Sequence, residues 1–375
     1  MQPIQLLAPD GSLAEHEVYS PYISGLTDED LRDLYRLMAT ERRIDAEATS
    51  LQRQGQLALW VPALGQEAAQ AGTVKALRPT DMIFPTYREH VMALHRGIRP
   101  AQLIELFRAT AHNAWDPLDH NMNAYMVVLG AQTLHAAGWA MGIQRDAASG
   151  NFAEGRQKDE IVLACYGDGA SSQGDVHESM VFASSYELPV LYFMQNNHWA
   201  ISVPSSTQSR GPLADRASGY GFEGVRVDGN DVLASYAVAA HLSAEVRQGG
   251  PKLIESVTYR MGAHTTADDP TKYRTAEDVA HWKARDPLDR YKTWLTAEGV
   301  ADDDFYAEVD HETGSLAAEL RQDVQDLEPL PLEEIMDTVY AEPHRQVEVD
   351  KAWLKDYEAG FAEEASLANG EGGAR

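Results

Sequence analysis

The sequence contains 375 residues, 44% of them hydrophobic, which is enough to build a large buried core. Its formal net charge of −27 disfavours partners rich in phosphate, so we expect neither nucleic acid nor an anionic membrane surface to bind. The single cysteine, Cys165, excludes a disulfide framework, and no stretch reaches the roughly 18 apolar residues that a membrane span needs.

Residues 1–26 predict an extended N-terminal arm, because the stretch is rich in Pro, Gly and Ser. Its first ten residues lack the basic and apolar pattern of a signal peptide, so we expect a cytoplasmic protein. Thr27, followed by three acidic residues, predicts the start of a helix with Thr27 as its cap. Apolar residues continue at helical spacing through Leu31, Leu34, Tyr35, Met38 and Ile44.

Two more helices are predicted, over residues 65–77 and 131–144. The second is crowded with Ala and Gly, which allows another helix to approach closely. Residues 112–125 lack periodicity and predict a loop between them.

Strands and helices then alternate along the chain. Apolar runs predict strands over residues 160–166, 190–194, 224–227 and 253–259, with helices over residues 175–186 and 232–247. This order is typical of an α/β fold, a parallel sheet covered by helices on both faces. We therefore predict one α/β domain over residues 27–345 with helical N- and C-terminal extensions. A charged helical tail follows over residues 346–375, with disorder over residues 370–375.

Gly167-Asp168-Gly169 lies directly after a predicted buried strand, where parallel sheets bind ligands. A dinucleotide loop would need Gly-x-Gly-x-x-Gly, but the next glycine is Gly174, and Asp168 would repel a pyrophosphate. The next strand ends at Asn196-Asn197, which puts the Asn197 amide beside the Asp168 carboxylate. Because both offer oxygen ligands, we predict that they share one Mg²⁺ and that the cation bridges to a diphosphate.

These two motifs, in this order and at this spacing, resemble the thiamine diphosphate motif. The wider stretches 167–178 and 195–204 resemble alpha subunits of 2-oxo acid dehydrogenases, and the resemblance extends over roughly residues 25–345. It implies a thiamine diphosphate-binding fold with Asp168, Asn197 and the main-chain carbonyl of Trp199 as the Mg²⁺ ligands. It also implies that Gly169 and Ala170 lie against the diphosphate.

The resemblance assigns further cofactor contacts. The Tyr87-Arg88-Glu89 segment resembles one in which Tyr87 lies by the cofactor and Arg88 binds its diphosphate, as guanidinium geometry favours. The turn that contains Leu129 resembles the one that passes the two rings of the cofactor.

The segment from Arg260 to Arg274 resembles the loop at the family's active-site mouth. It identifies His264 as a catalytic-site histidine that contacts the diphosphate and assists reductive acylation of the lipoyl group. Tyr273 and Arg274 are expected to order the loop or to meet the lipoyl domain. We also expect Arg260 and Arg274 to bind Asp268 or Asp269.

Two acids on the helix after the Gly-Asp-Gly turn, Asp175 and Glu178, match a pair proposed to relay a proton between active sites. The alternative is that they are solvated acids favoured by the helix dipole. His112 is a weaker match to another active-site histidine.

A second α/β domain with the glutamate that activates the aminopyrimidine is not predicted in this sequence, so the resemblance implies a beta subunit and an α2β2 heterotetramer. The reaction implied is oxidative decarboxylation of a 2-oxo acid, followed by reductive acylation of the lipoyl group of an acyltransferase component. The substrate is a branched-chain 2-oxo acid such as 3-methyl-2-oxobutanoate, or pyruvate, and the Trp60 and Tyr125 segments are expected to shape its pocket. Two alternatives stay open at this point, an acetoin dehydrogenase alpha subunit and a non-catalytic regulator that binds magnesium and a nucleotide.

Overall fold

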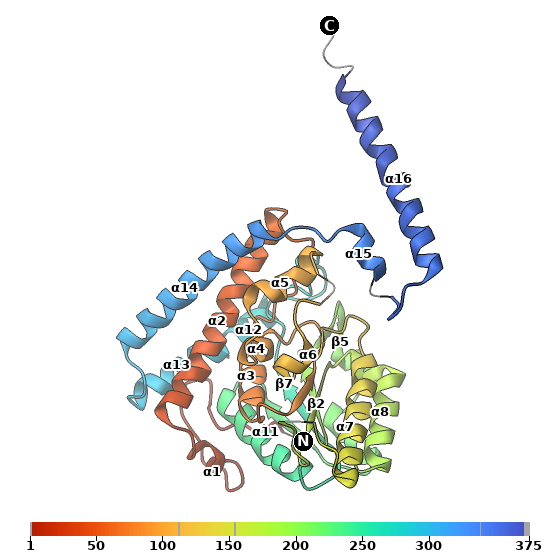
Figure 1. Cartoon of the computed structure of the whole chain (residues 1–375). Coiled ribbons are helices and arrows are strands. Elements are labelled where there is room, and N and C mark those ends of the chain that lie inside the picture. Colours follow the sequence, from red (N-terminus) through yellow and green to blue (C-terminus); the bar gives the residue numbers. More distant parts are fainter. Residues whose placement is uncertain (1, 112, 154, 338, 371–375) are drawn as a thin grey trace.

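The computed structural model describes residues 2–111, 113–153, 155–337 and 339–370. Its centre is a five-stranded parallel sheet with the strand order β1-β2-β3-β7-β6, which confirms the predicted α/β class (Figure 1). A two-stranded antiparallel pair, β4 and β5, directly follows β3. The strands are β1 (Met82–Phe84), β2 (Val162–Gly167), β3 (Val190–Asn196), β4 (Trp199–Ala200), β5 (Val203–Pro204), β6 (Gly224–Asp228) and β7 (Lys252–Val257).

Helices make up most of the rest of the described chain. The longer ones are α2 (Asp28–Arg53), α3 (Glu67–Lys75), α4 (His90–His95), α5 (Pro100–Arg108), α7 (Ala131–Ser149), α8 (Gly174–Ser185), α11 (Val232–Val246), α12 (Ala276–Lys283), α13 (Pro287–Ala297), α14 (Asp303–Asp326), α15 (Leu332–Asp337) and α16 (Arg345–Gly370). The single turns are α1 (Ser20–Ile23), α6 (Pro117–His120), α9 (Ser205–Gln208), α10 (Arg216–Gly219), η1 (Ala170–Ser172), η2 (Leu213–Asp215) and η3 (Pro270–Lys272).

Both faces of the sheet are covered, as the alternation of predicted strands and helices indicated. Along β2, Leu163 and Cys165 pack into a core shared with α3, α5 and α11. The alternate residues Val162, Ala164 and Tyr166 pack into a second core under α7 and α8. Because successive side chains of a strand point to opposite faces, this division is the signature of a sheet between two helical layers.

The N-terminal helix α2 begins as predicted. The Thr27 hydroxyl accepts a hydrogen bond from Asp30 N at 3.2 Å, and the Asp30 carboxylate accepts one from Thr27 N at 3.0 Å. This reciprocal cap satisfies two of the donors that a helix N-terminus leaves unpaired. The apolar face of α2 packs on α13 and α14 in a third core.

Several elements of the structure were not predicted, among them β1, α4, α5 and the turn α1, which lies within the arm that was predicted to be extended. β1 was not predicted, because its three residues are too few to show a periodic pattern. Within the predicted 112–125 loop, residues 117–120 form the single turn α6, which Asp116 caps by accepting a hydrogen bond from Leu118 N at 2.8 Å.

The N-terminal arm is attached to the edge of the sheet. Ile4 forms a parallel bridge with Val227 of β6. The buried Asp231 carboxylate accepts hydrogen bonds from the main-chain nitrogens of Leu6 at 2.7 Å and Leu7 at 2.6 Å. The side chains of Leu6 and Leu7 are buried, so the arm contributes to the core.

The C-terminal helix α16 extends away from the body and packs mainly against α15 (Figure 1). Trp353, Tyr357 and Phe361, each four residues after the last, are 63%, 51% and 51% exposed. They form a ladder of aromatic rings along one face of the helix. Residues 371–375, part of the end predicted to be disordered, lie outside the described residues. None of the described helices combines the length and apolar character needed to cross a membrane.

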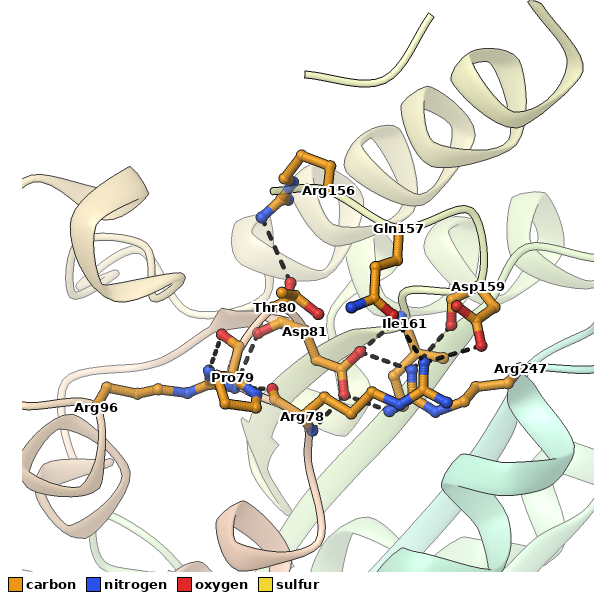
Figure 2. Close-up of polar contacts among 10 residues, drawn as sticks. All are labelled: Arg78, Pro79, Thr80, Asp81, Arg96, Arg156, Gln157, Asp159, Ile161 and Arg247. Carbon is orange, nitrogen blue, oxygen red and sulfur yellow. Dashed lines mark hydrogen bonds and ion pairs between the residues drawn. The ribbon is translucent and has the colours of Figure 1, made fainter. Parts of the chain in front are cut away.

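The amino ends of β1 and β2 are joined by a cluster of charged residues (Figure 2). Asp81, just before β1, is fully buried and forms an ion pair with both terminal nitrogens of Arg247. The same carboxylate accepts hydrogen bonds from Ile161 N at 3.0 Å and Arg78 N at 2.7 Å. Arg78 and Asp159 form a more exposed pair at 2.8 Å beside it. This cluster lies at the end of the sheet opposite the carboxyl ends of the strands.

Candidate functional site

A cavity of about 270 Å³ opens at the carboxyl ends of the parallel strands. Segments that follow β1, β2, β3 and β7 all reach it, as the parallel topology requires. Its walls are formed by Gln66, Thr86, Tyr87, Arg88, Glu89, Leu129, Gly167, Asp168, Gly169, Ala170, Gln173, Gln195, Asn197, Trp199, Ala200, Ile201, Arg260 and His264. All nine residues predicted to contact the cofactor are among them.

Asp168 lies at the floor of the cavity and is 1% exposed. Its Oδ2 atom has no hydrogen-bond partner among the described residues. Burial raises the pKa of Asp168 to about 6, because an ionised carboxylate is poorly solvated there. The Oδ2 atom of an ionised Asp168 therefore lacks a direct partner among the described residues, and a bound cation would supply one.

The neighbouring Gly169 allows a close approach of two segments. A Cβ atom on Gly169 would lie 2.6 Å from the Cβ of Ala200 in β4, which is closer than carbon atoms pack. Glycine at this position lets the β4–β5 pair close over the turn that carries Asp168.

Asn197 lies beside Asp168, because β2 and β3 are adjacent and Gly167 is in register with Gln195. The Asn197 Nδ2 atom donates to Gln66 at 3.0 Å, and its Oδ1 atom accepts from Trp199 N at 3.2 Å. The main-chain carbonyl of Trp199 accepts from Arg260 at 3.3 Å. Each of these two oxygens keeps a second lone pair, so the donor set still fits a hard cation.

Two buried guanidinium groups, those of Arg88 and Arg260, face the same cavity. Burial lowers the pKa of both groups. Neither takes part in any of the ion pairs found among the described residues. Arg88 donates to the carbonyls of Pro62 and His264, and Arg260 donates to those of Trp199 and Ile201. Two buried cationic groups without carboxylate partners make this wall suited to a multiply charged anion.

His264 lies between the two arginines. Its Nδ1 atom is 3.3 Å from an Arg88 nitrogen and 3.3 Å from an Arg260 nitrogen. Burial, together with the two nearby positive charges, lowers the pKa of His264 to about 4. The imidazole is therefore neutral at pH 7. Because Nδ1 faces donors and must accept, the proton is on Nε2, which can donate a hydrogen bond to an anion.

The remaining three predicted cofactor contacts, Tyr87, Leu129 and Ala170, also line the cavity. The Arg88 guanidinium lies 5.7 Å from the centre of the Tyr87 ring, which itself lies 6.3 Å from the His264 ring. Leu129 precedes Gly130, whose φ of 106° allows the sharp turn into α7. Trp60 and Tyr125, expected to shape a substrate pocket, do not line this cavity, because both are buried behind it against His90.

The loop predicted at the mouth of the site is ordered by Tyr273. Its hydroxyl accepts from Arg260 at 2.8 Å and donates to Asp268, which also accepts from His264 N at 2.8 Å. Arg274 donates to the carbonyls of Arg260 and Met261. The expectation that the arginines bind Asp268 or Asp269 directly was wrong, because carbonyls and a hydroxyl take their hydrogen bonds instead.

Asp175 and Glu178 do not line the cavity. Both are exposed, in the first two turns of α8. His112 lies outside the described residues, so the structure says nothing about its predicted role.

The donor set fits a hydrated Mg²⁺ bound to a phosphate group. No group of three or more His, Cys, Asp or Glu side chains within the described ranges could hold a metal ion by itself. Mg²⁺ does not need one, because it often takes one or two protein oxygens and completes its shell with phosphate oxygens and water. The buried Asp168 carboxylate suits a cation, and Arg88 and Arg260, which form no ion pair with the described carboxylates, suit an anion, so the cavity fits both together.

Arg260, Glu89 and Gln195 line the cavity, although the sequence had not assigned them to cofactor binding. Arg260 follows β7, so its position after a predicted strand could have indicated that it lies at the cavity. Glu89 and Gln195 lie within the recognised segments, but their hydrogen bonds join parts of the chain about 100 residues apart.

The sequence matches the family described as "Dehydrogenase E1 component" over residues 35–332. It is 44% identical over 344 residues to the 3-methyl-2-oxobutanoate dehydrogenase subunit alpha of Mycobacterium tuberculosis, covering 91% of this chain and 90% of the relative. It is 34% identical to the pyruvate dehydrogenase E1 component subunit alpha of Staphylococcus epidermidis, covering 90% of this chain and 89% of the relative. The protein of the same name from Staphylococcus aureus is 35% identical, covering 82% of this chain and 80% of the relative.

Proposed function

Because this chain belongs to the dehydrogenase E1 component family, we propose that it is the alpha subunit of a thiamine diphosphate-dependent 2-oxo acid dehydrogenase. One observation carries the cofactor assignment. The buried Asp168 carboxylate, whose Oδ2 atom has no hydrogen-bond partner among the described residues, shares a cavity with Arg88 and Arg260, which have no carboxylate partners there. A magnesium diphosphate complements both, because the cation satisfies the carboxylate and the phosphates satisfy the guanidinium groups.

Each part of the cavity then has a role. Asp168, the Asn197 side chain and the Trp199 carbonyl would hold Mg²⁺, and Gly169 and Ala170 would lie against the diphosphate. Arg88 and His264 would bind the diphosphate oxygens, and Tyr87 and Leu129 would lie by the organic part of the cofactor. When bound, thiamine diphosphate supplies the electron sink for decarboxylation, while the protein supplies position and charge.

We assign the substrate as a branched-chain 2-oxo acid. The relative that is 44% identical is named for 3-methyl-2-oxobutanoate, whereas the relatives named for pyruvate are 34% and 35% identical. The partners are a beta subunit in an α2β2 heterotetramer and a lipoyl-bearing acyltransferase component. We place this assembly in the cytoplasm.

Three further roles are proposed for residues outside the cavity. Tyr273 and Arg274 hold the loop that carries His264, a role that their hydrogen bonds to Asp268 and to main-chain carbonyls support. Their contact with a lipoyl domain is a second role. Asp175 and Glu178, exposed on α8, are candidates for a proton relay between the two active sites of a heterotetramer.

Reconstitution with a beta subunit tests the proposal. The chain alone should be inactive, and the assembled complex should oxidise 3-methyl-2-oxobutanoate faster than pyruvate or acetoin when thiamine diphosphate and Mg²⁺ are present. Turnover by the isolated chain at about 1 per second or more would contradict the requirement for a beta subunit. A complex that preferred acetoin would be an acetoin dehydrogenase, and one that bound a magnesium nucleotide but no thiamine diphosphate would be a regulator.

A further inference from the structure

Gln195 occupies a central position between the two charged sides of the cavity. It lies in β3 and is 3% exposed. Its main-chain carbonyl accepts hydrogen bonds from Asp168 N at 3.3 Å and from Asn197 N at 3.1 Å. One peptide group therefore contacts both residues that offer side-chain oxygens to the cation.

The side chain of Gln195 points to the other side of the cavity. Its Nε2 atom donates to Glu89 at 2.6 Å, and its Oε1 atom accepts from Gln70 at 3.0 Å. The orientation of the amide follows from these partners, because the Glu89 carboxylate accepts and the Gln70 amide nitrogen donates. Both partners are fully or almost fully buried.

These partners in turn hold the segment that carries Arg88. Glu89 accepts from Thr86 N at 2.5 Å and from the Thr86 hydroxyl at 2.7 Å. The Gln70 amide donates to the Arg88 carbonyl at 2.9 Å, and the Thr86 hydroxyl accepts from Arg88 N at 3.2 Å. The main chain around Arg88 is thus fixed by groups that Gln195 contacts directly.

We infer that Gln195 is a positioning residue that sets the distance between the cation side of the cavity, Asp168 and Asn197, and its anion side, Arg88. It acts through Glu89 and Gln70 and does not itself bind the cofactor. The inference rests on the proposed function, because it concerns the binding of thiamine diphosphate and Mg²⁺. It adds a residue to which the sequence had given no role.

The chemistry of the Gln195–Glu89 contact makes the inference testable. Gln195→Glu keeps the shape of the side chain but places a second carboxyl group against Glu89, where two carboxylates cannot both be ionised. The contact then needs a shared proton. The loss of cofactor affinity should therefore be larger at pH 8 than at pH 6, relative to the unmodified protein at the same pH.

A double variant restores the hydrogen bond in reverse. In Glu89→Gln/Gln195→Glu the new amide at position 89 can donate to the new carboxylate at position 195. The amide oxygen at 89 still accepts from Thr86, and the second carboxylate oxygen at 195 still accepts from Gln70. The number of hydrogen bonds and the net charge are unchanged, and no shared proton is needed. This variant should bind the cofactor normally.

The measurement is the Kd for thiamine diphosphate at saturating Mg²⁺ in the assembled complex, together with the melting temperature without cofactor. We expect Gln195→Glu to raise Kd at least tenfold at pH 8, with a smaller ratio at pH 6, and the double variant to lie within threefold of the unmodified complex. Gln322→Glu is the matched control, because Gln322 also donates to a carboxylate, that of Asp326, but on the exposed surface of α14. Its Kd should be unchanged.

Several results would overturn the inference. One is a Kd for Gln195→Glu within twofold of the unmodified value at both pH values. Another is a double variant that binds more than threefold more weakly than the unmodified complex, or that fails to assemble. If the complex with Gln195→Glu does not assemble, the double variant alone tests the inference, with the same threefold limit on its Kd. An unmodified complex that binds no thiamine diphosphate would instead refute the proposed function.

Discussion

Asp168 is deeply buried, and no positively charged side chain of the described residues is in hydrogen-bonding contact with it. Its pKa, raised by burial to about 6, predicts a pH effect on cofactor binding. A magnesium ligand must be ionised, so protons compete with the cation at and below that pH. We expect the Kd for thiamine diphosphate, measured with Mg²⁺ by titration of the assembled complex, to rise as the pH falls from 7 to 5. The rise should approach tenfold per pH unit below pH 6.

The same residue predicts a substitution effect. Asp168→Asn should raise Kd at least 100-fold, because it removes the charge that the cation needs, and Asn197→Ala should act in the same direction. Asp326→Asn, an exposed aspartate on α14, is the control and should leave Kd unchanged. Kd values for Asp168→Asn and Asn197→Ala within threefold of the unmodified complex would refute the metal site.

His264 predicts a difference between two assays. If its Nε2 proton assists acyl transfer, His264→Ala should lose most activity with a lipoyl acceptor yet keep much of the decarboxylation seen with an artificial electron acceptor. His264→Gln, whose amide nitrogen can still donate, should retain more acyl transfer than His264→Ala. Equal losses in both assays, with weaker cofactor binding, would show that the residue only holds the loop.

The sequence predicted which residues line the cavity better than it predicted which side chains bind one another. All nine predicted cofactor contacts line one cavity, and eight of them lie in segments that follow a strand of the sheet, whereas Leu129 precedes α7. The positioning of Gln195 against Glu89 depends on side-chain hydrogen bonds between distant segments, which no local pattern records. Arg274 was expected to bind an aspartate, but the nearby carbonyls of Arg260 and Met261 accept its hydrogen bonds.

Among the elements, the amino ends of β1 and β2 depend on the buried Asp81–Arg247 pair (Figure 2). Asp81→Asn leaves the Arg247 charge without its partner, so it should lower the free energy of unfolding by about 3 kcal/mol. Asp159→Asn is the control, because its pair with Arg78 is 40% exposed on the Asp159 side and should contribute below about 1 kcal/mol.

Denaturant unfolding of the purified chain measures both values. Cofactor affinity should be normal in both variants once the complex is assembled, because the cluster lies at the end of the sheet away from the cavity. A loss no larger for Asp81→Asn than for Asp159→Asn would mean that water or a rearranged neighbour solvates Arg247.

The elements themselves were largely predictable. The strands β2 and β3 contain apolar runs of six and five residues in the sequence, a strong signal for buried parallel strands. In β6 and β7 the apolar residues are interrupted by Arg226 and by Glu255-Ser256, but the alternation with predicted helices still identified both strands. β1 can be recognised only from its pairing with β2 in the structure. β4 and β5 can be recognised only from their pairing with each other after the turn at Asn197. Such short strands owe their existence to neighbours rather than to their own composition.

For the whole molecule, the isolated position of α16 predicts that the tail adds little to the stability of the body. Removal of residues 345–375 should leave the melting temperature of the chain within about 2 °C, because the exposed Trp353, Tyr357 and Phe361 contribute little buried area. Truncation after residue 302 is the control. It also removes α14, whose Phe305, Tyr306 and Val309 are buried in the core with α2, so it should destabilise the chain strongly. A large loss on removal of α16 alone would contradict the independence of the tail.

The strand order of the sheet has a consequence for synthesis of the chain. β7 is the last strand to leave the ribosome, yet it lies between β3 and β6. Until residues 252–257 emerge, β3 and β6 have no bridge between them, and each exposes an apolar edge able to pair with another nascent chain. The N-terminal arm is synthesised first, but Ile4 cannot form its bridge to the sheet until Val227 has been synthesised. A chain that stops before residue 252 therefore contains most of its core residues but cannot join β3 to β6. We expect such truncated products to be bound by chaperones or degraded by proteases, and not to act as partial enzymes.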